Sequence, residues 1–293
     1  MADSGGKIVA IINQKGGVGK TTSTVNLGAV LAREMGQRVL LVDLDPQGSM
    51  SDHVGLDPNA TEESVYDVIV EGMDPEKVIR TVHGMDAIPA NLDLASAEFD
   101  LAPAQDRNTR LRDALAKVRD RYDFILIDCP PSLGMLTVCG LAAADEVIVA
   151  MEAEYLALRG ISQLMQTVDK VASALNPELH VSGVLFCRFD GRVTLAKQVR
   201  DEVEKYFPGK VFATTIRRNI RLAEAPSMGM TILDYEPRSA GAEDYRLVAR
   251  EFMARYAGDV LASVVDGEPA EVEAEVEADI LASMPMRQEN GAE

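Results

Sequence analysis

A glycine-rich loop that carries lysines and threonines is the part of the sequence best suited to phosphate chemistry. Residues 14–22 read QKGGVGKTT, with glycines at positions 16, 17 and 19. Glycines let the backbone of such a loop curl so that several N–H groups point inward, where they can hold a phosphate. Lys20 can reach the outer phosphates of a nucleotide, and the hydroxyl of Thr21 can ligate Mg²⁺. The alternative is a glycine turn that binds no ligand.

Aspartates form the second group of candidate residues. Asp43 and Asp45 follow the apolar run 38–42, and Asp128 ends the run 122–128. Because Asp43 and Asp45 are two residues apart, they project the same way if strand geometry persists, toward a metal ion or an attacking water. Carboxylates at the carboxyl ends of parallel strands lie where open α/β sheets bind ligands. Asp128 therefore stands where an acid orients Mg²⁺ or its bound water. In the alternative interpretation, Asp43 and Asp45 only cap a turn.

The elements that must position these residues alternate between strands and helices. Apolar runs of strand length occupy residues 8–12, 38–42, 85–89, 122–128, 146–150 and 181–187. Helical periodicity covers residues 25–35, 61–70, 107–121, 161–175 and 240–253, with Asn108 and Thr109 as candidate caps of the third helix. This alternation predicts an α/β fold: a single domain with a mostly parallel twisted sheet and helices on both faces. The glycine-rich loop would be its phosphate-binding loop (P-loop).

Composition limits where the protein works. With 293 residues the chain can bury a substantial core, and it has no uninterrupted apolar run of about 18 residues. Its N-terminus, MADSGGK, lacks an apolar signal core, so we expect a cytoplasmic protein. Three scattered cysteines do not form a disulfide framework and are expected to be reduced. His53 and His83 have no second ligand at metal spacing, so we predict polar loop or surface histidines.

The net charge of −18 argues at first against a nucleic-acid partner. The charge is unevenly distributed, however. Residues 266–293 carry nine acids and one arginine, whereas residues 188–221 carry nine Lys or Arg and four Asp or Glu. The excess of acidic over basic residues extends beyond residues 266–293, and such a composition would also suit a protein in a high-salt cytoplasm. Because this basic segment lies within an acidic chain, binding to a phosphate-rich partner is still compatible with the sequence.

The loop departs from the strict pattern G-x-x-x-x-G-K-[ST], because position 14 is glutamine and Lys15 follows it. The run K-G-G-V-G-K-T-T resembles the deviant Walker A loop of the ParA/MinD family of P-loop ATPases. The resemblance implies that Lys15 reaches across a dimer interface to the partner's nucleotide; without it, Lys15 is a solvated loop lysine. The nucleotide-binding residues that it implies are Lys15, Gly16, Gly17, Val18, Gly19, Lys20, Thr21, Thr22, Arg218 and Asn219.

Two further loops resemble the family's switch loops, D-L-D-P-Q-G at 43–48 and D-C-P-P-S-L-G at 128–134. The resemblance implies that Asp45 positions the hydrolytic water, which makes Lys15, Lys20 and Asp45 the catalytic residues. The implied Mg²⁺ ligands, direct or through water, are Thr21, Asp43 and Asp128. Arg159 departs from the family's E-Y-Y-A-L-E-G pattern, where an acid is usual. Arg217 replaces a proline in a loop that usually borders the adenine ring.

Four arginines resemble the DNA-binding positions of chromosome-partition members of the family: Arg192, Arg218, Arg221 and Arg238. Residues 215–227, TIRRNIRLAEAPS, closely match the family's I-P-R-N-V-R-L-S-E-A-P-S stretch. Guanidinium groups on phosphates release counterions without reading bases, and two subunits double the number of contacts. The alternative is a solvated face on which these arginines pair with the chain's many acids.

The resemblance covers residues 7–257, with residues 1–6 as an N-terminal extension and 258–293 as an acidic tail whose composition favours disorder. It implies an ATPase with ATP and Mg²⁺ as cofactors. An ATP-driven homodimer would bind double-stranded DNA nonspecifically on the nucleoid, and hydrolysis stimulated by a ParB-type partner would release it.

Other activities of the family agree with the sequence to different degrees. Positioning of another cargo, such as a protein cluster or microcompartment, and a DNA-coating scaffold that hardly turns over ATP both stay open. A membrane-bound ATPase of the MinD kind would need a basic amphipathic C-terminal helix, which the acidic tail opposes, so no stable membrane association is expected. A redox ATPase would need cluster cysteines, and the sequence has no C-x-x-C motif.

Overall fold

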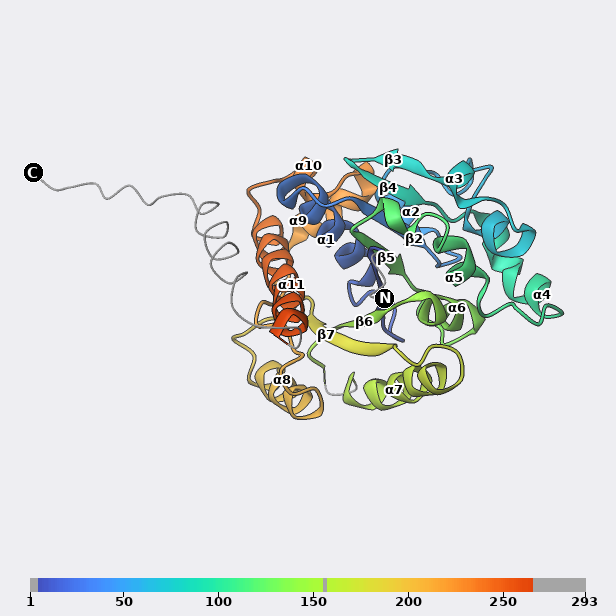
Figure 1. Ribbon diagram of the computed structural model, residues 1–293. Coiled ribbons are helices and arrows are strands. Elements are labelled where there is room, and N and C mark those ends of the chain that lie inside the picture. The colour runs from blue at the N-terminus through green and yellow to red at the C-terminus, as the bar shows by residue number, and fades with distance from the viewer. Residues whose placement is uncertain (1–4, 155–156, 266–293) are drawn as a thin grey trace, which may run out of the picture. The chain divides into compact units, whose positions relative to one another are not determined.

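A seven-stranded sheet in the order β3-β4-β2-β5-β1-β6-β7 forms the centre of the computed structural model, which describes residues 5–154 and 157–265 (Figure 1). The strands are β1 (Lys7–Ile12), β2 (Val39–Asp43), β3 (Arg80–Val82), β4 (Met85–Ile88), β5 (Phe124–Asp128), β6 (Glu146–Met151) and β7 (His180–Phe186). All neighbouring pairs are parallel except β3 and β4 at one edge. The predicted mostly parallel sheet is confirmed.

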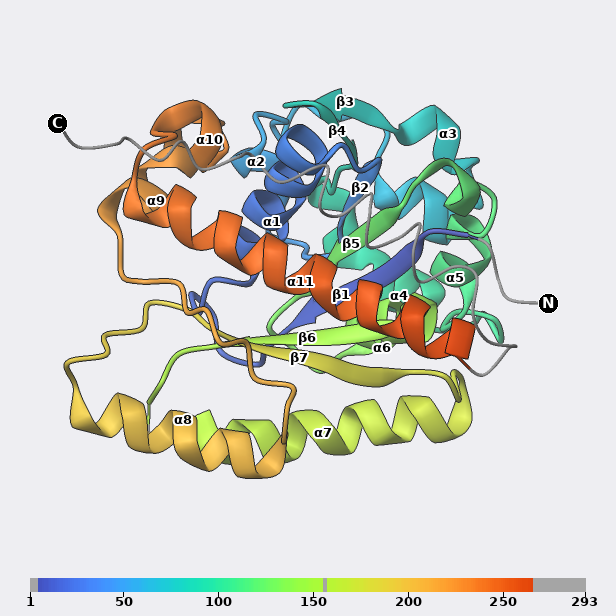
Figure 2. The same ribbon diagram turned by 60° about the vertical axis from the view of Figure 1, so that its left-hand side comes forward.

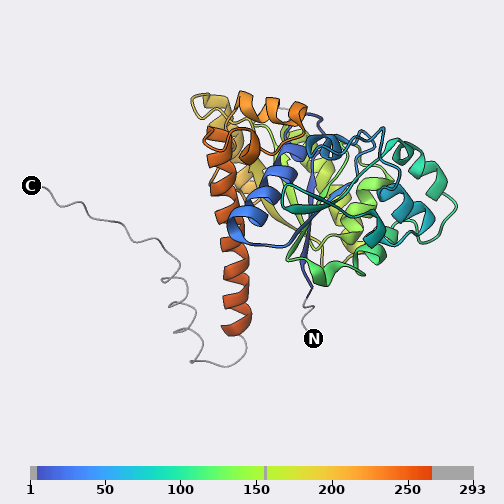
Figure 3. The ribbon, with the colours of Figure 1, turned by 90° about the horizontal axis from the view of Figure 1, so that it is seen from above.

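Helices flank the sheet on both faces (Figures 2 and 3). The α-helices are α1 (Lys20–Met35), α2 (Ser49–His53), α3 (Pro75–Val78), α4 (Ala97–Leu101), α5 (Arg110–Leu115), α6 (Met135–Ala143), α7 (Ala157–Ala174), α8 (Thr194–Tyr206), α9 (Ile220–Glu224), α10 (Ile232–Tyr235) and α11 (Ala240–Val265). Four short segments are π- or 3₁₀-helical: η1 (Asp67–Glu71), η2 (Leu92–Ser96), η3 (Arg119–Arg121) and η4 (Ala225–Met228).

The central strands are apolar runs because both of their faces are covered. Every residue of β2, β5 and β6 is buried, as expected for parallel strands between two helical layers. One face, through Ile8, Ala10 and Ile12 of β1, belongs to a core cluster that also contains buried residues of α5 to α8. On the other face α1 contacts β1, β2 and β5. The helices on both faces therefore hold the sheet in place, so that its strand ends have fixed positions.

Two predicted helices are shorter than the sequence indicates. In the range 61–70, helical structure begins only after Ser64, whose hydroxyl accepts from the N–H of Tyr66 while the carboxylate of Asp67 accepts from the N–H of Ser64. This reciprocal capping fixes the start of the helical turn at Val65, which leads into η1. In the range 107–121, α5 ends at Leu115 and a turn precedes η3. Thr109 occupies the N-cap position, but its side chain makes no capping hydrogen bond.

The chain divides into two compact units, residues 1–251 and 252–293. In the second unit the rings of Phe252 and Tyr256, one turn apart on α11, pack edge to face with centroids 4.8 Å apart. The last helix continues to Val265, so the predicted start of the tail at Gly258 falls inside α11. The rest of the predicted tail lies outside the described residues.

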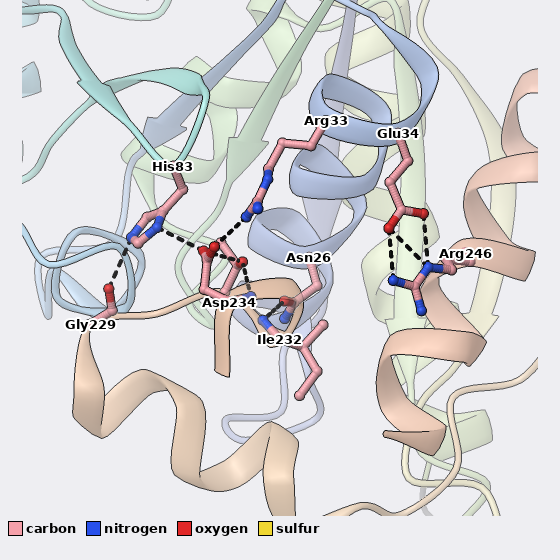
Figure 4. A network of polar contacts seen from close by, with 9 residues as sticks. Asn26, Arg33, Glu34, His83, Gly229, Ile232, Asp234 and Arg246 are labelled. Carbon is pink, nitrogen blue, oxygen red and sulfur yellow. Dashed lines mark hydrogen bonds and ion pairs between the residues drawn. The ribbon is translucent and has the colours of Figure 1, made fainter. Parts of the chain in front are cut away.

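Polar contacts tie α1 to later parts of the first unit (Figure 4). The side chain of Asn26 accepts from the N–H of Ile232 at 2.7 Å, and Glu34 pairs with Arg246 at 2.7 Å. Asp234 pairs with both Arg33 and His83. Because α1 starts at the glycine-rich loop, these contacts hold the helix behind that loop in a fixed position.

His53 corrects one sequence prediction, because it is buried and not a surface histidine. Its side chain is 1% exposed at the end of α2, and its Nε2 atom has no hydrogen-bond partner among the described residues. Burial, with a smaller contribution from the nearby His83, lowers the pKa of His53 from 6.5 to about 4. A sequence pattern cannot show this, because the covering residues come from distant segments, including the backbone at Met230.

We expect the depressed pKa of His53 to make the protein acid-sensitive. A histidine whose folded pKa is about 4 and whose unfolded pKa is about 6.5 contributes stability that is complete above pH 6.5 and is lost as the pH falls toward 4. Between pH 7 and pH 5 this histidine should remove about 2 kcal/mol from the free energy of unfolding. Urea denaturation of wild type and His53→Gln at both pH values measures the difference. The exposed His180, changed to Gln, is the matched control, and an equal pH dependence in wild type and His53→Gln would contradict the assignment.

Candidate functional site

The glycine-rich loop leads directly from β1 into α1. Gly17 and Gly19 have φ angles of 74° and 104°, in the left-handed region that favours glycine. A Cβ atom on Gly19 would also lie 3.1 Å from the Cβ of Cys187, so the loop is packed closely against the end of β7. Gly19 is the N-cap of α1, which directs the N-terminal end of this helix and its free N–H groups at the loop.

A cavity of about 670 Å³ opens beside this loop, a volume within the range of small-molecule sites. Predicted nucleotide-binding residues from the glycine-rich loop and from positions 218 and 219 line it together. Arg217, Leu222 and Tyr245 are among the other lining residues. The predicted residues that line it are Gly17, Gly19, Lys20, Thr21, Thr22, Arg218 and Asn219. Val18 is buried toward a second cavity, and Gly16 is exposed in the loop.

The predicted metal ligands Thr21, Asp43 and Asp128 lie at adjacent strand and helix ends. Asp43 and Asp128 are register partners at the ends of β2 and β5, and both are fully buried. The Thr21 hydroxyl donates to Oδ2 of Asp128 at 2.6 Å. Burial raises the pKa of Asp43 to about 6, and burial with the charge of Asp43 raises that of Asp128 to about 8.

This donor set fits Mg²⁺, because hydroxyl and carboxylate oxygens are its preferred ligands and two facing buried carboxylates favour a cation beside them. Among the described residues, no three His, Cys, Asp or Glu side chains gather as a metal site of their own. A cation here would therefore take further ligands from phosphate and water, as Mg²⁺ does at nucleotide sites.

Asp43 and Asp45 also hold the turn that follows β2. Asp43 accepts from the N–H of Asp45 at 3.2 Å and from the N–H and hydroxyl of Ser51 at 2.8 and 2.7 Å. Asp45 accepts from the N–H of Gln47 at 3.0 Å and is 8% exposed. The turn-capping alternative raised by the sequence is thus present in the geometry, and the hydrolytic role of Asp45 stays a prediction.

Lys15 extends away from the nucleotide-sized cavity. Its Nζ atom lies 2.8 Å from Glu152 and 2.9 Å from Glu154, and it lines a second cavity of about 340 Å³ with both acids. Hydrogen bonds to these carboxylates raise the pKa of Lys15, so the ammonium stays charged. Arg188 also pairs with Glu152, at 3.0 Å. The sequence alone does not indicate Glu152 or Arg188 as neighbours of Lys15, because neither belongs to a motif that connects it to the glycine-rich loop.

Arg217 connects the wall of the larger cavity to α11 through two acids that the sequence does not indicate, Glu243 and Asp244. The N–H and guanidinium of Arg217 both donate to Asp244, at 2.8 and 2.9 Å. Asp244 is nearly buried, and Glu243 pairs with the same arginine at 3.0 Å. Arg217 therefore contributes little free positive charge. The arginine that replaces the family's proline instead fixes the loop at 215–219 against the helix. The side chain of Arg159, the other departure, lies outside the described residues.

The predicted DNA-binding arginines fall into two groups. Arg192 is paired with Asp190 and Arg221 with Glu224, both at 2.8 Å. Within residues 5–154 and 157–265, neither Arg218 nor Arg238 forms an ion pair, and both are exposed. The solvated-face alternative therefore describes Arg192 and Arg221 better than it describes the other two arginines.

Comparisons with known proteins agree with this geometry. A family model described as an AAA domain matches residues 6–181. The sporulation initiation inhibitor protein Soj of Bacillus subtilis (strain 168) is 51% identical over 251 residues, which are 85% of this chain and 99% of that protein. The chromosome-partitioning ATPase Soj of Treponema pallidum (strain Nichols) is 50% identical over 252 residues, covering 85% of this chain and 98% of that protein.

A solved structure has the same fold and was determined with a nucleotide analogue. It is titled cobyrinic acid a,c-diamide synthase from Mycobacterium smegmatis with bound ATP analog and magnesium, and it is 38% identical with a TM-score of 0.77. The alignment covers 86% of this chain and 95% of that chain. Within residues 5–154 and 157–265, no helix combines the length and the apolar character of a membrane span. From the family model and the extent of identity to the Soj proteins, the chain belongs to the ParA/Soj family of P-loop ATPases.

Proposed function

We propose that the protein is a DNA-partition ATPase whose ATP-bound dimer binds DNA nonspecifically and whose hydrolysis, stimulated by a ParB-type partner, releases it. The observation that carries the proposal is the position of Lys15. Its ammonium contacts Glu152 and Glu154 and lines the smaller cavity, away from the cavity lined by Lys20 and Thr21. A second phosphate-binding lysine directed away from its own site is available for the site of another subunit.

ATP and Mg²⁺ are the cofactors of this ATPase. The loop N–H groups and Lys20 hold the phosphates, while Thr21, Asp43 and Asp128 hold the cation directly or through water. A bound Mg²⁺ would supply positive charge beside the phosphate oxygens. Asp45 orients the attacking water from the turn after β2. We place all of these steps in an ATPase domain of residues 7–257.

In this proposal the γ-phosphate gates DNA binding. Two subunits join when Lys15 of each reaches the other's phosphates, which requires Lys15 to leave Glu152 and Glu154. The dimer then presents two sets of basic residues to DNA. Because both sets contact phosphates of the same duplex, the dimer binds DNA more tightly than a monomer does. Hydrolysis removes the contact that joined the subunits, and the monomers dissociate from DNA. We therefore place the protein in the cytoplasm, on the nucleoid.

The unpaired arginines provide the test of DNA binding. We expect Arg238→Glu and Arg218→Glu to weaken binding of the ATP-bound dimer to DNA roughly 10-fold to 100-fold at 0.1 M salt, because each subunit loses one phosphate contact and gains a repulsive charge. Arg238 gives the clearer result, since Arg218 also lines the nucleotide cavity. Fluorescence anisotropy with labelled duplexes of unrelated sequence measures the change.

The matched control is Arg112→Glu, which makes the same charge change at an exposed position of α5, where the wild-type arginine pairs with the neighbouring Asp113 at 3.2 Å. It should bind DNA within about 3-fold of wild type, since charges separated by more than a Debye length are largely screened. Equal losses in all three variants would attribute the effect to net charge. No loss in Arg218→Glu or Arg238→Glu, with dimerisation intact, would contradict the proposed DNA-binding surface.

A further inference from the structure

An apolar stripe lies on the solvent side of the helical segment formed by η2 and α4. The inner side of this segment is buried through Leu94, Ala97 and Leu101. The outer stripe, which we define as Leu92, Ala95 and Phe99, repeats at the helical spacing i, i+3, i+7. Leu92 is 61% exposed, and Phe99 at 84% is the most exposed of the large apolar side chains in the described residues. Figure 1 shows α4 at the periphery of the first unit.

Such a stripe is typical of an interaction surface. A single exposed apolar side chain needs no explanation, but a second apolar face on a helix whose inner face is already in the core does. The stripe spans residues 92–99, which is about two helical turns, or roughly 11 to 14 Å of helix axis. This length matches two turns of a partner helix packed against it.

Acidic residues flank the outer stripe. Asp93, Glu98 and Asp100 are all exposed, and residues 92–101 contain no Lys or Arg. Arg107, the first basic residue after the segment, donates to the carbonyl groups of Ala102 and Ala104 instead. The surface therefore combines apolar side chains with negative charge, and a complementary partner is apolar and basic.

Glu98 connects this segment to the second switch loop. Its Oε1 atom accepts a hydrogen bond from the N–H of Met135, the first residue of α6, at 2.9 Å. Gly134 is the N-cap of α6 and has no side chain to cap it, so the carboxylate of Glu98 supplies the cap from another element. A Cβ atom on Gly134 would lie 2.4 Å from that same oxygen. The loop at 128–134, which begins at Asp128, is thus held at its end by a residue of α4.

We propose that the outer stripe is the docking surface for a basic amphipathic helix of a partner protein, and that Glu98 transmits docking to the switch loop. The inference rests on the proposed function, because the helix is taken to belong to the ParB-type protein that stimulates hydrolysis. The chain's own residues 266–293 are a poor occupant, since they carry nine acids and one arginine. A second copy would bring the same acidic surface against itself.

The test uses the full-length protein, ATP, DNA and the purified ParB-type protein encoded in the same genome. We expect Phe99→Ser to weaken binding of that partner about 10-fold to 100-fold, as truncation of a central aromatic contact does, while hydrolysis without the partner is unchanged. Phe99→Leu should restore most of the affinity. The control Tyr206→Ser changes another exposed aromatic, on α8, and should bind as wild type does.

Glu98→Ala separates docking from transmission. We expect it to retain partner affinity within about 3-fold, because Glu98 is one of three acids beside the stripe, but to lose most of the stimulated hydrolysis. Stimulation of Phe99→Ser equal to that of wild type at every partner concentration would overturn the docking surface and leave the proposed function intact. Normal stimulation of Glu98→Ala would overturn the transmission step. A partner that neither binds nor stimulates wild type would overturn both the proposed function and this inference.

Discussion

Lys20→Ala is expected to lower ATP affinity by about 100-fold or more, which corresponds to about 2.7 kcal/mol or more of binding free energy. Lys20 is 6% exposed at the first position of α1 and lines the larger cavity with Thr21. Its charge offsets part of the negative charge at Asp128, and no neighbouring lysine in the loop lines that cavity to replace it. Equilibrium binding of a fluorescent ATP analogue measures the loss.

Lys15→Ala is the matched control, because it removes a lysine from the same loop. Since Lys15 contacts Glu152 and Glu154 and not the larger cavity, this variant should bind ATP as a monomer within about 3-fold of wild type. It should fail to form the ATP-dependent dimer, which sedimentation detects. Retained ATP affinity in Lys20→Ala would contradict the phosphate-loop assignment, and normal dimerisation of Lys15→Ala would contradict the role proposed for Lys15.

Asp45→Ala is expected to reduce ATP hydrolysis by about 100-fold to 1,000-fold and to leave an ATP-bound dimer on DNA. The expected size follows from the loss of a group that orients or activates the attacking water. Single-turnover hydrolysis measures the chemical step, and co-sedimentation with DNA measures the trapped dimer. The N–H of Gln47 would lose its acceptor as well, so a second variant is needed to separate chemistry from structure.

Asp45→Asn provides that separation. Its amide oxygen can accept from the N–H of Gln47, as the carboxylate does, but it cannot take a proton from water at neutral pH. If Asp45 acts on the water, both variants should be slow and both should dimerise. Normal hydrolysis in Asp45→Asn, with failed dimerisation in Asp45→Ala, would assign Asp45 to the turn alone.

The parts of the site that depend on local sequence could be predicted. The glycine positions, the strand that precedes them and the helix that begins at Lys20 follow from backbone chemistry within about 30 residues. The placement of Asp43 beside Asp128 also follows, because acids at the ends of parallel strands meet at one edge of the sheet.

Contacts between distant segments could not be predicted in the same way. Lys15 and Glu152 are 137 positions apart, and no spacing rule connects them. The sequence showed Arg217 only as a replacement for the family's proline, whereas its pairing with Asp244 and Glu243 makes it an anchor for the cavity wall. His53 was expected to be a polar loop or surface histidine, but it is buried. Burial of a short helix end depends on distant segments that cover it, and these cannot be identified from the local sequence.

The sequence did indicate a basic segment, but not which arginines are available to a ligand. Arg192 and Arg221 are each paired with a nearby carboxylate, whereas Arg218 and Arg238 form no ion pair within the part of the chain that the structure describes. An arginine that already forms an ion pair contributes less to DNA affinity, because that ion pair must break before the arginine can contact a phosphate.

If the γ-phosphate gates DNA binding, DNA affinity must depend on the bound nucleotide, and one titration measures this dependence. Wild-type protein is titrated into a labelled duplex with saturating ATP and Mg²⁺, with ADP and Mg²⁺, and without nucleotide, at several salt concentrations. We predict tight binding only with ATP, equal for duplexes of unrelated sequence, and a steep fall in affinity as salt rises. Equal DNA affinity in all three nucleotide states, or no binding in any of them, would rule out gating of DNA binding by the γ-phosphate.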